Sequence, residues 1–184
     1  MSGSAAEWAH PQRLADWLGH GVDAELVSRI LGVPRLLRRT GRLIGDRLGS
    51  PAGSAMQMRA LSLDGFALLG LAQQAGLIWH ARTIVRAIDG PDVRALIEMI
   101  GAGGRTFAIR HAALAPMDAP VMSVPALPEA IRADGARCLV AWSDAQQEPV
   151  GRRLVLRLST CDEPSTLHRT DGLRIVEALL GSES

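Results

Sequence analysis

The chain has 184 residues, of which 47% are hydrophobic and 21% charged, and its formal net charge is +1. This length and composition are typical of one folded domain and are too apolar for a disordered chain. All 20 basic residues are arginines, which excludes P-loop NTPases, pyridoxal enzymes and protein kinases because each needs a lysine. The near-zero net charge and the 3% of aromatic residues also weigh against a dedicated nucleic-acid-binding protein.

Helical signals dominate the first 48 residues. Pro11 and Pro34 occupy positions where proline commonly begins a helix, and Asp23 is a good N-cap for a helix over 24–31 that Gly32 ends. The spacing predicts a third helix from Pro34 to Leu48. We therefore expect an N-terminal helical section over 1–48.

The Gly-, Ser- and Pro-rich stretch that follows predicts a flexible linker over 49–60, before a main helical body over 61–181. Together these sections form one domain in our interpretation. Helices are predicted after Ser62 or Asp64 and again over 77–88 beyond a break at Gly76. Further helices are predicted in the regions 91–100, 105–114 and 129–142, and after Thr170 or Asp171. The segment 115–128 contains four prolines and predicts a loop.

The segment Arg153–Leu158 alternates apolar and polar residues, which is a strand pattern. No second strand accompanies it, so the segment fits either an edge strand or the tail of a helix. The predicted fold class is mainly α: a single compact multi-helix domain with at most a minor β element near 153–158.

Residues that could carry chemistry are sparse. His80 and His111 lack partners at metal-ligand spacing, and both fit a structural role in helices better than catalysis. The glycines of 101–104 follow a helix and predict a C-terminal glycine turn rather than a phosphate loop. Cys138 lies in an apolar helical segment and Cys161 in a polar loop, where neither forms a metal or disulfide motif. We expect no enzymatic activity, no cofactor and no metal.

The strongest polar surface feature is the arginine face of the third predicted helix. Its candidate partner-binding residues are Arg35, Arg38, Arg39 and Arg42. Such a face can bind nucleic acid, an anionic membrane surface or an acidic protein. It can also be a solvated face whose charges pair with local acids such as Asp46. If the face is functional, the composition favours an acidic protein partner.

Three phrases in fixed order carry a resemblance to a known family. They are Leu77–Arg86, Arg105–His111, and Cys138–Trp142 followed by Arg152–Leu158. Their order and spacing resemble the K protein of bacterial type III secretion systems (SctK, or YscK), in which a Leu-rich helix with His and paired Arg precedes an Ala-Trp helix and an Arg-Leu run. Residues before about Leu61 show no phrase that aligns with this family.

The resemblance implies a non-enzymatic adaptor of the sorting platform that links the inner-membrane ring protein SctD to the pod protein SctQ. Alternatives from the residues alone are an Arg-rich regulator or anion- or nucleic-acid-binding module and, less favoured by the charge, a secretion chaperone. No apolar run reaches the roughly 18–20 residues of a membrane span, and the first residues lack the apolar region of a secretory signal. We therefore expect a cytoplasmic protein at the inner face of the membrane.

Overall fold

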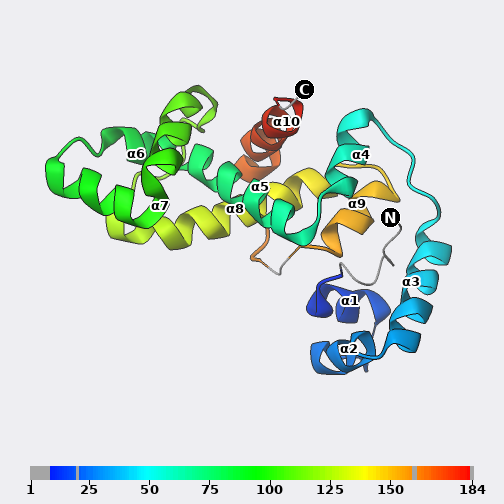
Figure 1. Cartoon of the computed structure of the whole chain (residues 1–184). Helices are drawn as coiled ribbons and strands as arrows, with labels where there is room; N and C mark the ends of the chain where they lie inside the picture. The colour runs from blue at the N-terminus through cyan, green and yellow to red at the C-terminus, as the bar shows by residue number, and fades with distance from the viewer. Residues whose placement is uncertain (1–8, 20, 159–160, 183–184) are drawn as a thin grey trace. The chain divides into compact units, whose positions relative to one another are not determined.

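The computed structural model describes residues 9–19, 21–158 and 161–182. The first eight residues, on which the expected lack of a secretory signal depends, lie outside this range. Within the described part the chain is mainly α-helical and contains no strand, which confirms the predicted fold class (Figure 1). The helices are α1 (Pro11–Leu18), α2 (Ala24–Leu31), α3 (Pro34–Leu48), α4 (Ala55–Ser62), α5 (Gly65–Trp79), α6 (Ala81–Arg86), α7 (Gly90–Arg110), α8 (Leu127–Asp144), α9 (Val150–Val155) and α10 (Leu173–Gly181).

The chain divides into two compact units. The first unit comprises residues 1–68 and 143–160, and the second comprises 69–142 and 161–184. Each unit therefore combines two separate stretches of the sequence. The predicted division of one domain into the sections 1–48, 49–60 and 61–181 remains a prediction.

The first unit begins with the three predicted N-terminal helices. The side chain of Asp23 accepts a hydrogen bond from the Leu26 amide (2.7 Å), which confirms its role as the N-cap of α2. Buried side chains of α1, α2 and α3 share one apolar cluster: Leu14, Ala15, Val27 and Ile44, with Ala9 and Leu156. Helix α4 begins within the stretch predicted as a linker, because Ser54 and Gln57 form a capping box at its start.

The segment Arg153–Leu158 is not a strand, so of the two alternatives the tail of a helix is confirmed. It continues α9 into a turn, and Val150, Gly151 and Leu154 are buried with the spacing of a helix. The alternation arose because Leu156 and Leu158, in the turn after the helix, are buried as well. The Arg157 guanidinium donates to the carbonyl oxygens of Leu61 (2.8 Å) and Leu63, and so satisfies partly buried acceptors at the C-terminal end of α4.

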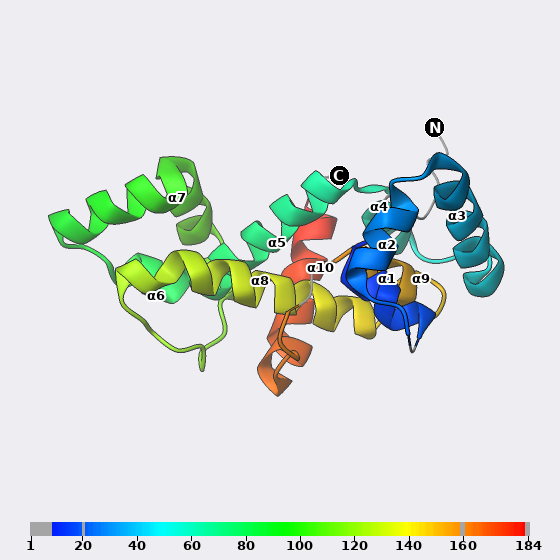
Figure 2. The ribbon, with the colours of Figure 1, turned by 90° about the horizontal axis from the view of Figure 1, so that it is seen from below.

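The second unit is built around a close crossing of α5 and α8 (Figures 1 and 2). A Cβ atom at Gly76 would lie 1.9 Å from the Ile131 carbonyl oxygen, and one at Gly135 would lie 2.0 Å from the Ala72 carbonyl oxygen. The two backbones therefore touch where both helices lack a side chain. Gly76 does not interrupt the helix as predicted, because α5 continues to Trp79 and the break falls at His80.

A second apolar cluster fills the space between α6, α7, α8 and the loop before α8. Its buried members are Leu77, Ala81, Ile84, Ala87, Leu96, Ala108, Ala115, Val124, Leu127 and Ile131. Helix α7 bends at Gly101, whose φ of +74° is a left-handed conformation, so the predicted glycine turn between two helical segments is confirmed. The loop 115–126 includes a 3-10 turn at Val124–Ala126 and packs against α6.

The C-terminal helix starts earlier than predicted. Helical residues begin at Thr166, and a π-helical turn over His168–Gly172 precedes α10, so neither Thr170 nor Asp171 is the cap. Gly172 lies against α8, because a Cβ atom there would come within 3.1 Å of the Cys138 sulfur. Trp79 and Trp142 are both buried.

No single described helix is both long and apolar enough to cross a membrane. The pair α4 and α5 passes the test of length and composition together, but the two helices meet at an angle of 117°.

Candidate functional site

The predicted partner-binding arginines all lie exposed on α3. At about 100° per residue, Arg35, Arg38, Arg39 and Arg42 fall within an arc of roughly 100° on the helix surface. The buried Ile44 lies about half a turn round the axis from Arg35, so this arc points away from the core. We call these four residues the arginine face.

The arginine face is not neutralised by neighbouring acids in the described part of the chain. Asp46 lies on the same side of α3, but it forms no ion pair with Arg42 or Arg39 in the structure as described. Arg47, the remaining arginine of the helix, is placed differently, because its guanidinium carbon lies 5.4 Å from the centre of the Trp17 ring. Among the described residues, the alternative in which the face pairs with Asp46 is therefore not observed, and these four arginines form no ion pair with a described acid.

The second unit contains a buried polar cluster that the sequence did not predict. Asp134 on α8 accepts a hydrogen bond from Nε2 of His80 (2.8 Å), and His80 itself is 1% exposed. On its other oxygen, Asp134 lies 3.3 Å from Nε2 of His168, within ion-pair range but without hydrogen-bond alignment. The ring of His168 stacks on Trp79 with 4.1 Å between centroids and 5° between planes.

The hydrogen-bond partners determine how the two rings are protonated. A carboxylate can only accept, so Nε2 of His80 must carry the proton that it shares with Asp134. The backbone amide of Ser165 donates to Nδ1 of His168 (3.3 Å), which leaves the proton of that ring on Nε2 as well. Nε2 of both imidazoles therefore carries a proton close to one carboxylate, but only His80 forms a hydrogen bond with it.

Arginine completes the cluster. Arg137 donates to Asp134 (2.7 Å) and also pairs with Asp162 in the segment before α10. Burial raises the pKa of the Asp134 carboxyl, but the interactions with His168, His80 and Arg137 outweigh it and hold the pKa well below its usual range. The charged carboxylate of Asp134 thus connects α8 with the α5–α6 break and the C-terminal segment. In this arrangement the residues of the cluster stabilise the fold.

The remaining sequence candidates are placed separately. His111, the residue that caps the C-terminus of α7, packs against Phe107 with ring centroids 4.4 Å apart. It forms no part of the cluster around His80. Cys138 is buried, and burial together with the Asp134 charge raises the pKa of its thiol well above the usual range. Arg82 donates to the Met117 carbonyl oxygen rather than to an acid. In the described residues no group of three or more His, Cys, Asp or Glu is arranged to hold a metal ion.

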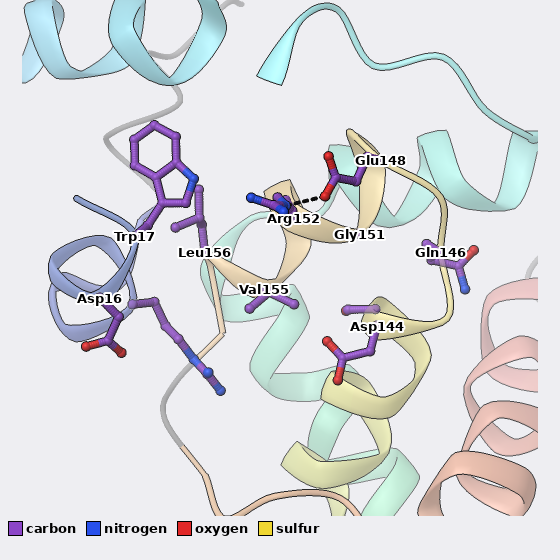
Figure 3. Close-up of a pocket in the computed structure, with 11 residues that line it drawn as sticks. Asp16, Trp17, Asp144, Gln146, Glu148, Gly151, Arg152, Val155 and Leu156 are labelled. Carbon is purple, nitrogen blue, oxygen red and sulfur yellow. Dashed lines mark ion pairs between the residues drawn. The ribbon is translucent and has the colours of Figure 1, made fainter. Parts of the chain in front are cut away.

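The first unit also contains an open recess of about 390 Å³ beside α1 and α9. Figure 3 shows Trp17 and Leu156 on one side of it and the ion pair between Arg152 and Glu148 on the other. Asp16 at its edge accepts a hydrogen bond from Gln12 (3.0 Å). The carboxylates of Asp16 and Glu148 are therefore each engaged with a neighbouring side chain.

Comparison with known proteins identifies the family. The chain is 30% identical over 167 residues to the nodulation protein NolU of Rhizobium fredii, and the match covers 86% of this chain and 76% of that protein. NolU of Sinorhizobium fredii strain NBRC 101917 / NGR234 matches to the same extent. The chain belongs to the NolU family. No family model and no solved structure matches it.

The extent of the match bears on the arginine face. The uncovered 14% of 184 residues amounts to about 26 positions, so the matched region begins no later than about residue 27. Helix α3 therefore lies inside the region shared with NolU, although it lies before the first phrase of the SctK resemblance. The helix that carries the arginine face is therefore covered by the match.

Proposed function

We propose that the chain is a non-enzymatic cytoplasmic adaptor of a bacterial type III secretion system, which links SctD at the inner-membrane ring to SctQ of the sorting platform. Membership of the NolU family supports the coarser part of this proposal, a role related to type III secretion. The finer part comes from the resemblance of three phrases to SctK proteins.

The observation that carries the proposal is the placement of those phrases in the fold. Leu77–Arg86 spans the end of α5 and all of α6, Arg105–His111 forms the second half of α7, and Cys138–Trp142 lies on α8. Leu77, Ala81 and Ala108 from the first two phrases belong to one buried cluster. The first two phrases therefore supply residues to one helical core, which supports a fold shared with SctK proteins.

The buried polar residues of the same unit support a binding role over a catalytic one. His80 and His168, the histidines that would be the natural acid–base groups, are both buried with Nε2 close to Asp134 inside the protein. The most prominent free charges are instead at the surface, on α3. An adaptor works through such surfaces and needs no reactive centre.

A pull-down between purified components tests the proposal. The full chain is mixed with the SctD cytoplasmic domain, with SctQ, and with both, and complexes are measured by size-exclusion chromatography with light scattering. We expect binary complexes with each component and a ternary complex with both. Failure to bind either component, in either order of addition, would sink the proposal.

The second candidate function is an Arg-rich regulator or anion-binding module, which the unpaired arginine face favours. Such a module would be retained on immobilised heparin at moderate salt and would lose affinity steeply as salt rises. Absence of retention, combined with a complex containing SctD or SctQ, favours the adaptor.

A further inference from the structure

An apolar stripe runs along the arginine face. Leu36 is 38% exposed and Leu43 is 37% exposed, although both lie on a helix whose core-facing side holds Ile44. On the helix surface the two leucines lie roughly 90° from the centre of the arginine face, one above the other at i and i+7. Helix α3 therefore presents cations and, beside them, partly exposed aliphatic side chains.

This combination discriminates among the anions that an arginine face can bind. A nucleic-acid backbone offers phosphates but no apolar counterpart to a row of leucines, and the face holds no aromatic residue for stacking on bases. A membrane-surface helix buries its main apolar side in the lipid, whereas in α3 that side holds the buried Ile44. An amphipathic protein helix supplies carboxylates and apolar side chains together.

We propose that the outward side of α3 is a docking surface for an acidic amphipathic helix of a protein partner. The partner's carboxylates lie against Arg35, Arg39 and Arg42, and its apolar residues cover Leu36 and Leu43. This inference rests on the proposed function for the identity of the partner, but its chemistry is independent of that identity.

The spacing of the face sets the pattern that the partner must carry. Arg35 and Arg42 are separated by about 10.5 Å along the helix axis, two turns at 1.5 Å per residue. A helix lying alongside α3 matches this span with Glu or Asp at i, i+3 or i+4, and i+7, next to a row of Leu or Ile. Arginine is suited to such contacts because its planar group can hold a carboxylate through two hydrogen bonds.

Charge reversal on the surface tests the inference without disturbing the core. The test variant is Arg39→Glu with Arg42→Glu, and the matched control is Arg94→Glu with Arg110→Glu on α7, where both arginines are exposed. A third variant, Leu36→Ser with Leu43→Ser, removes the stripe alone. Circular dichroism and urea unfolding establish that each variant is folded before binding is measured.

Binding is measured to the SctD cytoplasmic domain, to SctQ, and to a designed helical peptide with Glu at i, i+3, i+4 and i+7 beside a row of Leu. A second peptide carries Gln in place of Glu. We expect the Glu peptide to bind at least about tenfold more tightly than the Gln peptide. The arginine and leucine variants should each lose at least about tenfold in affinity for the Glu peptide and for one of the two proteins, while the control variant keeps its affinity.

The outcomes separate the two proposals. If the wild-type chain binds the Glu peptide as expected but neither SctD nor SctQ, the proposed function fails and the docking chemistry stands. If it binds SctD or SctQ and both test variants bind as tightly as the control, the docking surface is overturned and the proposed function stands. Binding to duplex DNA or to vesicles containing phosphatidylglycerol that the arginine variant loses and the leucine variant keeps would also overturn the inference.

Discussion

The crossing of α5 and α8 predicts a large penalty for the smallest possible side chain. In Gly76→Ala, the added Cβ atom would lie 1.9 Å from the carbonyl oxygen and 2.7 Å from the carbonyl carbon of Ile131. Both are backbone atoms, so no rotation of a side chain can relieve the overlap and the two helices must move apart. We expect this variant to be less stable than the wild-type protein.

The magnitude follows from two opposing effects. Replacing a glycine by alanine inside a helix favours the helix by about 1 kcal/mol. Overpacking in a close-packed interior costs about 1–3 kcal/mol, and a clash with the backbone belongs at the upper end. The net loss in the free energy of unfolding is therefore about 2 kcal/mol, which corresponds to a fall in Tm of about 4–8 °C for a chain of this length.

The same helix offers a matched control at Gly70, where an added Cβ atom would meet nothing within 4 Å. Gly70→Ala should gain the helix propensity without the clash and be more stable than wild type by about 1 kcal/mol. Urea unfolding followed by circular dichroism measures both variants. If Gly76→Ala is as stable as Gly70→Ala, the helices do not cross as closely as the structure describes and the reasoning is refuted.

Three further predictions concern a buried carboxylate, an arginine at the end of α4, and the two cysteines. Because the folded-state pKa of Asp134 lies below its unfolded value of about 3.9, its charge stabilises the fold above that pH, and this contribution is lost as the pH falls. Asp134→Asn should lower the free energy of unfolding at pH 7 by about 1.5–3 kcal/mol and should reduce the further loss of stability below pH 4, as measured by urea unfolding at several pH values. An unchanged loss of stability below pH 4 would contradict this. Arg157→Met should cost about 1–2 kcal/mol by leaving carbonyl groups at the end of α4 unpaired, and hydrogen exchange should rise in α4 before the other helices; uniform exchange would argue against a capping role. In native protein Cys161, which is partly exposed, should react with a thiol reagent before the buried Cys138, and equal rates, or no difference after Cys161→Ser, would show that the burial is wrong.

The helix starts could be predicted because their signals are local. The proline at each N-terminus and the Asp23 side chain act within one turn of the helix they begin, so a single sequence contains all the information. The arginine face could be predicted for the same reason, since a helical repeat alone places its four members on one side. Local signals failed at Gly76, where the reason for glycine is a neighbouring helix more than 50 residues away.

The buried cluster could not be predicted, because its members are distant in the sequence. Asp134 is 54 residues from His80, and nothing in the local pattern of either residue names the other. The alternation at 153–158 misled for a related reason: apolar residues at every second position suit a strand, but they also suit a short helix that ends in a turn. The segment is a helix and a turn because its apolar residues are buried against distant parts of the chain.

The interleaved composition of the two units limits how their binding surfaces can be mapped. The chain passes from one unit to the other within α5, within α8, and again near residue 160. A fragment such as 61–181 would keep residues 143–160 while losing the N-terminal stretch that contributes Leu14 and Ile44 to their apolar cluster. Deletion series would therefore report loss of folding as loss of binding. Surface substitutions in the full-length chain avoid this confusion, and genetic insertions belong at exposed turns rather than at apparent boundaries.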